Sequence, residues 1–189
     1  MEVIHTEYAI GQATVATVAP NYEGENPSTS TIVTAASTFE TDYEIERQKP
    51  MPSKLHARIQ GNIYFEIRKA YEQYDVYPEL SLELTSGKAV PDIALLNAET
   101  VDFSQDEIKV KTVPQLVVEI LSPRQNIDEI KEKITNIYHP AGLKSIWLVI
   151  PPLQTVSLVL PNGQFKTFTE GVVKDLYLDI ELNMADIFK

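Results

Sequence analysis

Residues 114–123 read PQLVVEILSP, an almost wholly apolar run with one charge, Glu119, in its middle. Such runs are typical of a central strand that is buried on both faces of a sheet, because alternation is lost when neither face meets water. Burying an unpaired carboxylate in a strand of this kind would cost several kcal/mol of desolvation free energy. The stretch therefore predicts a covered sheet and a partner for Glu119.

A helix is expected on each side of this strand along the chain. Ser53 is a helix-start signal before KLHARIQGNIYFEIRKAYEQY, which has apolar residues at four-residue spacing: Leu55, Ile59, Ile63, Ile67 and Tyr71. A second helix follows Ser122 and Pro123 and ends near Pro140 and Gly142, and its apolar stripe consists of Ile127, Ile130, Ile134 and Ile137.

Further strands complete the expected sheet. Leu80, Leu82 and Leu84 alternate before a Ser86-Gly87 turn, and the apolar run 93–96 follows Pro91, which predicts two adjacent antiparallel strands. SIWLVI at 145–150 reads as another buried strand, and VSLVL, PNG and FKTF over 156–168 read as an edge hairpin. The last segment, 176–189, predicts a short strand and a terminal helical turn. This order indicates an α/β fold with a mixed sheet flanked by helices.

Length and composition narrow the class of protein. A chain of 189 residues suits one domain with an N-terminal extension, which we expect over residues 1–42 as an extended or partly ordered arm before a domain at 43–189. The absence of cysteine excludes disulfides and thiolate chemistry, so any metal must sit on oxygen or imidazole. No signal peptide or membrane-length apolar run is present in the sequence, and we expect a cytoplasmic location and no membrane partner.

The net charge of -11 argues against a protein that coats nucleic acid nonspecifically. The charge is uneven, however. Residues 1–46 contain no Lys or Arg, whereas 47–69 hold six basic residues against Glu66 alone. This basic segment predicts a surface for a phosphate backbone, and a solvated helix face is the alternative.

Asp92 and Glu119 are the leading candidates for chemistry. Asp92 follows Pro91 beside an apolar run, and Glu119 lies inside another. If these strands are neighbours, both carboxylates can converge on one hard cation, and Mg²⁺, or Mn²⁺ in its place, prefers oxygen ligands and keeps waters that can become a nucleophile. The alternative is purely structural: a carboxylate that pairs with a lysine or caps backbone N–H groups.

A phosphodiester hydrolase also needs a cation near the developing negative charge, and the second helix offers Lys131 and Lys133. At 100° per residue, Lys131 falls about 60° from the centre of the isoleucine stripe and Lys133 about 100° away, so periodicity slightly favours Lys131. His56 on the first helix is a weaker candidate for a base, a metal ligand or a substrate contact, and Lys54 and Arg58 are candidates for contacting the DNA backbone. No GxGxxG, P-loop, GxSxG or HExxH pattern occurs, which disfavours nucleotide-binding folds, serine hydrolases and zinc proteases.

The succession of PMPSKLHARIQ, VPDIALL, PQLVVEILSP, a lysine-bearing helix ending in Y-x3-G, and SIWLV-x-PP resembles the Uma-two family of restriction-endonuclease-like proteins, abundant in cyanobacteria. The resemblance runs from about Tyr43 to the C-terminus. It implies a restriction-endonuclease-like mixed β-sheet flanked by helices, within the PD-(D/E)xK nuclease superfamily, here with an N-terminal extension and a C-terminal β-hairpin. It also implies that Asp92 and Glu119 are the acidic ligands of a divalent ion.

Two departures from the family pattern concern the site. Leu121 stands where the superfamily usually has its lysine, and the family pattern instead uses a lysine on the following helix. Counting back from Tyr138 places that slot at Ile134, so the lysine is either Lys133, shifted by one, or Lys131. The resemblance implies a Mg²⁺-dependent endonuclease that hydrolyses DNA, with pairing into a homodimer as a further expectation. The alternative is a catalytically inactive nuclease-fold module that binds a partner.

Overall fold

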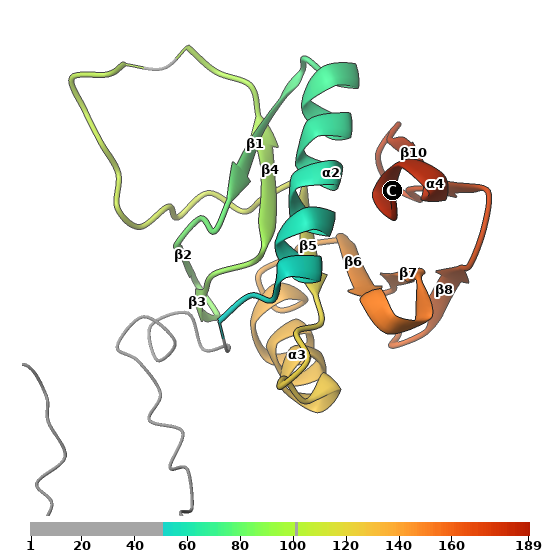
Figure 1. Cartoon of the computed structure of the whole chain (residues 1–189). Coiled ribbons are helices and arrows are strands. Elements are labelled where there is room, and N and C mark those ends of the chain that lie inside the picture. The colour runs from blue at the N-terminus through green and yellow to red at the C-terminus, as the bar shows by residue number, and fades with distance from the viewer. Residues whose placement is uncertain (1–50, 101) are drawn as a thin grey trace, which may run out of the picture. The chain divides into compact units, whose positions relative to one another are not determined.

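The predicted central strand lies in the middle of a six-stranded mixed sheet. The computed structural model describes residues 51–100 and 102–189, so the expected N-terminal extension and its boundary lie outside the described residues. The strand order is β1-β4-β5-β6-β7-β8, in which β5 and β6 are parallel and the other neighbours are antiparallel (Figure 1). These strands are β1 (Tyr74–Pro78), β4 (Ile93–Asn97), β5 (Leu116–Ile120), β6 (Ser145–Ile150), β7 (Thr155–Val159) and β8 (Phe165–Phe168). The fold class is the predicted one.

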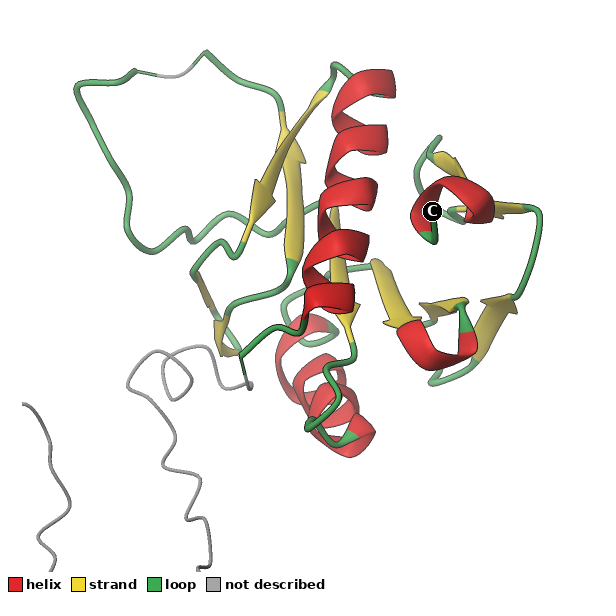
Figure 2. Ribbon diagram, viewed as in Figure 1, coloured by secondary structure: helices red, strands yellow, loops and turns green. Residues whose placement is uncertain are grey.

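Two helical layers cover this sheet, one on each face (Figure 2). Helix α2 (Lys54–Ala70) packs Ile59, Ile63 and Ile67 against the face that carries Val118 and Ile120. Helix α3 (Ile127–Lys133) continues into a π-helical turn, η1 (Ile134–Tyr138), and both pack against the opposite face. Every residue of β5 is buried, because each of its faces meets a helix.

The pairing of the first strands differs from the prediction. The strands at 82–84 and 93–97 are not partners: β2 (Leu82–Leu84) forms a tight hairpin with β3 (Gly87–Ala89), and β4 pairs with β1. The reason is the Ser86-Gly87 turn, which folds the residues directly after it back onto β2. Gly87 has a φ of 152°, and a Cβ there would lie 3.3 Å from Ile137 Cγ1, so the hairpin needs glycine to pack against η1. Strand β1, YDVYP, was missed because the helical pattern was extended to residue 74.

The start of α2 also differs in one position. Ser53 is the N-cap, as predicted, and its hydroxyl accepts from the backbone N–H of His56 at 3.2 Å. Leu55, expected in the apolar stripe, is 50% exposed, and His56 is buried instead. The first turn faces the polar end of β4, where an acidic side chain rather than an apolar surface meets the helix.

Within the described residues, no helix combines the length and the apolar character needed to cross a membrane.

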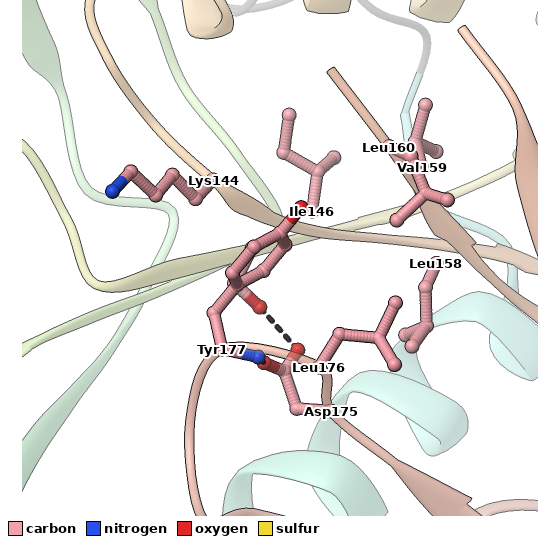
Figure 3. A pocket seen from close by; sticks show the side chains of 9 residues that line it. Lys144, Ile146, Leu158, Val159, Leu160, Asp175, Leu176 and Tyr177 are labelled. Atoms are coloured by element: carbon pink, nitrogen blue, oxygen red, sulfur yellow. Dashed lines mark hydrogen bonds between the residues drawn. The ribbon is translucent and has the colours of Figure 1, made fainter. Parts of the chain in front are cut away.

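The C-terminal region is built on a buried carboxylate, Asp175. It follows β9 (Val172–Lys174), which pairs with β10 (Glu181–Asn183) before the terminal helix α4 (Met184–Ile187), close to the predicted strand and helical turn. Asp175 accepts from Ser145 Oγ, from Trp147 Nε1 at 2.7 Å, and from the backbone N–H groups of Tyr177 and Leu178 at 2.8 and 2.9 Å. Figure 3 shows Asp175 among the side chains that line a small hollow, with Lys144, Ile146 and Tyr177 around it. Asp175 therefore joins β6 to the loop before β10.

Replacing Asp175 should destabilise the fold. Asp175→Ala leaves the buried Trp147 and Ser145 donors without an acceptor, so we expect the free energy of unfolding to fall by about 2–4 kcal/mol in a urea titration. The exposed Asp179 provides the control, and Asp179→Ala should change it by about 0.5 kcal/mol or less. Equal effects of the two substitutions would contradict a structural role for the Asp175 contacts.

Candidate active site

The two candidate carboxylates, Asp92 and Glu119, lie side by side on neighbouring strands. Strands β4 and β5 are antiparallel with Ile93 opposite Val118, so the next position along the ladder holds Asp92 opposite Glu119. Residues directly opposite each other in an antiparallel pair have Cβ atoms roughly 5 Å apart. Both carboxylates are almost fully buried, at 0% and 1% exposure. The sequence prediction that they converge agrees with this register.

The Asp92 side chain accepts a hydrogen bond from the backbone of β5, just beyond the last paired residues of β4 and β5. The N–H of Leu121 bonds to Val149 of β6, so the N–H of Ile120 points the other way, toward β4. Asp92 Oδ2 accepts that N–H at 2.6 Å, in the place where a strand carbonyl would otherwise stand. The Asp92 carboxylate is therefore fixed relative to the backbone that carries Glu119.

Helix α2 holds the same aspartate from its first turns. His56 Nε2 lies 3.1 Å from Asp92 Oδ1, an ion-pair distance without the alignment of a full hydrogen bond. Gln60 Nε2 donates to the Asp92 carbonyl at 2.7 Å. His56 is 1% exposed, so it contacts the candidate ligand rather than the surface. This burial corrects its expected place among substrate contacts, because a DNA backbone meets only exposed side chains.

Glu119 receives two donors on one oxygen. Lys133 Nζ donates to Oε1 at 3.1 Å, and Tyr138 Oη donates to the same oxygen at 2.5 Å. The other oxygen, Oε2, is buried and has no hydrogen-bond partner within residues 51–100 and 102–189. A buried carboxylate oxygen without a donor is rare in folded proteins and marks a place for an ion or a water molecule.

The Tyr138 hydroxyl remains protonated in this environment. Complete burial raises the pKa of Tyr138 well above its ordinary value, and the charges of Glu119 and Asp92 raise the pKa further. The neutral hydroxyl is therefore a donor to Glu119 over the whole neutral range. That Asp92 also acts on Tyr138 agrees with the closeness of the two carboxylates.

The structure places Lys133, and not Lys131, at the carboxylates. Lys133 is only 7% exposed, whereas Lys131 is exposed and pairs with Asp128 at 3.1 Å. The slight preference of the sequence pattern for Lys131 was wrong because it assumed 100° per residue throughout. The turn from 134 to 138 is π-helical, with the N–H of His139 bonded to the carbonyl of Ile134 at 2.9 Å. That wider turn moves the buried stripe toward Lys133 and Tyr138.

The basic segment is only partly available to a substrate. Lys54 and Arg58 are exposed on α2, but Arg58 Nε donates to the Lys189 carbonyl at 2.7 Å. Arg58 therefore ties the C-terminus to α2. Its expected contact with a DNA backbone would have to share the guanidinium with that bond.

The loop after β5 contains two residues that the sequence pattern did not single out. Ser122 Oγ and Gln125 Nε2 are buried and have no hydrogen-bond partner, although Gln125 Oε1 lies 3.4 Å from the Ser122 N–H. Neither residue type is distinctive in a loop, and only the burial reveals them. Tyr138 appeared in the sequence only as a spacing marker, since a tyrosine at the end of an apolar stripe looks like core.

The donor set suits a hard divalent cation. Asp92 and Glu119 supply oxygen, and Glu119 Oε2 is a buried carboxylate oxygen without a hydrogen-bond partner among the described residues. Among residues 51–100 and 102–189, no three His, Asp or Glu side chains are arranged to hold a metal ion. The fit is therefore to an ion such as Mg²⁺, which keeps several of its waters, rather than to an ion enclosed by protein ligands.

Comparisons with known proteins support the fold and the family of this chain. One solved structure, of a protein described as a putative nuclease belonging to DUF820 from Anabaena variabilis ATCC 29413, has a TM-score of 0.61 and 24% sequence identity over 74% of this chain and 83% of that chain. At this identity the likeness establishes the fold. No curated protein matches the chain. Residues 41–184 match the model of the family Uma2, described as "Putative restriction endonuclease", and the chain belongs to that family.

Proposed function

We propose that this protein is a nuclease that hydrolyses DNA phosphodiester bonds with Mg²⁺ or Mn²⁺ bound between Asp92 and Glu119. The observation that carries the proposal is the buried pair of carboxylates on adjacent strands, of which Glu119 has an ion pair with a buried lysine and one oxygen without a partner among the described residues. Membership of the Uma2 family supports the same class of activity. A structural core seldom buries two acidic side chains next to each other without a functional reason.

Each residue has a defined task in this proposal. Asp92 and Glu119 bind the cation, and the Ile120 N–H and His56 keep the Asp92 carboxylate in place. Lys133 supplies a buried positive charge within 3.1 Å of Glu119 Oε1, where it can stabilise the negative charge that develops on the phosphate. When bound, a divalent ion supplies a water of lowered pKa and polarises the phosphate oxygen.

A nuclease-fold binding module without catalysis is the second candidate. Its support is that each carboxylate already has a protein partner, Lys133 for Glu119 and the Ile120 N–H for Asp92. A surface hollow of about 300 Å³ beside Lys133 is also lined by Glu129 and Glu132, whose charges disfavour a phosphate. The net charge of -11 agrees with this candidate.

Cleavage of supercoiled plasmid and of single-stranded DNA separates the two functions. We expect cutting that needs Mg²⁺ or Mn²⁺ and is lost in Asp92→Asn and in Glu119→Gln, because each change removes a charged ligand while keeping the side-chain size. Asp128→Asn is the matched control, since the Asp128 side chain is exposed and pairs, among the described residues, with Lys131 alone. If wild type and both variants show the same background with either metal, the catalytic proposal fails and the binding module takes its place.

The lysine assignment has a test of its own. Lys133→Met should lower the rate of cleavage at least about a hundredfold, because it removes the buried cation beside the carboxylates. Lys131→Met should leave the rate within about twofold, because an exposed pair with Asp128 contributes little. Circular dichroism and urea unfolding would establish that both variants are folded. The reverse order of effects would assign the role to Lys131.

A further inference from the structure

The π-helical turn brings together two side chains that an α-helix would separate. Lys133 and Tyr138 are five residues apart, which corresponds to about 140° around an α-helix at 100° per residue. They nevertheless bond to the same atom, Glu119 Oε1. The turn between them has i→i+5 hydrogen bonding, with His139 N–H bonded to the Ile134 carbonyl, and this places residues five apart on one side.

The two donors make the two oxygens of the Glu119 carboxylate different from each other. Oε1 is occupied by an ammonium group and a hydroxyl, whereas Oε2 is buried without a donor. Two bonds from different directions fix the rotation of the carboxylate about its last torsion angle, which is otherwise broad. Oε2 is therefore held in one orientation and remains available to a ligand.

Lysine alone would not fix this orientation. Its ammonium group is a compact charge on a flexible stem with three donors, and it can follow either oxygen. The tyrosine ring is fully buried and cannot follow the carboxylate, and its hydroxyl donates to Glu119 Oε1. The hydroxyl therefore decides which oxygen is occupied, and the lysine supplies the charge.

We propose that Tyr138 is a positioning residue for metal binding: presented beside Lys133 by the π-helical turn, its hydroxyl holds Glu119 Oε1 and thereby directs Oε2 toward the divalent cation. This inference rests on the proposed function, because it takes Glu119 as a metal ligand. Tyr138 itself does not contact the cation or the substrate. It acts only through the carboxylate.

The test is the affinity of the purified full chain for Mn²⁺, measured from the electron paramagnetic resonance signal of the free ion, with Mg²⁺ as competitor. Residues that orient a metal ligand typically change metal affinity by about 10–100-fold when replaced. We expect Tyr138→Phe to weaken Mn²⁺ binding at least about tenfold, because Lys133 can then bond to Oε2, and Glu119→Gln to abolish specific binding.

Tyr71→Phe is the matched control. It removes a hydroxyl that donates to the Glu181 carbonyl at 3.0 Å and has no contact with Glu119, so a merely structural loss would appear in both tyrosine variants. Mn²⁺ affinity in Tyr71→Phe should stay within about twofold of wild type. Circular dichroism on all variants would establish that they are folded.

The outcomes separate the two proposals. Binding that is lost in Glu119→Gln but unchanged in Tyr138→Phe overturns the role of Tyr138 and leaves Glu119 as a ligand. Equal weakening in Tyr138→Phe and Tyr71→Phe also overturns it. Identical binding, or none, in wild type and Glu119→Gln overturns the metal site itself and with it the proposed function.

Discussion

The structure depends on how one charge is accommodated in a strand that is buried on both faces. Glu119 cannot be moved to the surface, because its neighbours Val118 and Ile120 belong to the core layer under α2 and Val117 belongs to the layer under α3. An unpaired carboxylate in such a place would destabilise the folded protein by several kcal/mol, and the bonds from Lys133 and Tyr138 offset that effect. The helix that follows β5 therefore serves two purposes: it covers the sheet, and it brings the groups that allow the charge to remain.

Asp92 is accommodated by different means, and the difference is instructive. Its carboxylate replaces a strand carbonyl at the end of the ladder, so its position follows directly from the pairing of β4 with β5. Strand pairing, helix packing and the placement of both carboxylates are thus linked. A shift of one residue in the register of β4 would turn Asp92 to the other face of the sheet, away from Glu119, and would exchange the apolar residues that β4 contributes to the two core layers.

The sequence predicted those parts of the molecule that follow from local patterns. The central strand, both long helical segments, the β7–β8 hairpin and the Ser53 cap were predicted because apolar periodicity and turn residues determine them locally. The partner of β4 was not predicted, because strand pairing depends on which segment reaches the free edge, and the start of YDVYP was assigned to the preceding helix. In the site, the two carboxylates were conspicuous as charges in apolar runs. The sequence left Lys133 and Lys131 open and periodicity slightly favoured Lys131, because no sequence pattern indicates a π-helical turn. Tyr138 was missed because a buried tyrosine resembles any other core aromatic residue.

The two outermost strands of the described sheet, β1 and β8, influence whether the sheet can pair with a strand of another molecule. Within the part of the chain that the structure describes, β1 and β8 are the outermost strands of the six-stranded sheet, and each pairs on one side. Strand β1 ends in Pro78, which has no N–H to offer, and β8 carries Lys166 between exposed residues. A proline and a lysine at these places discourage a second chain from extending the sheet. Pro78 and Lys166 therefore oppose the edge-to-edge strand pairing by which chains with an apolar sheet aggregate at high concentration.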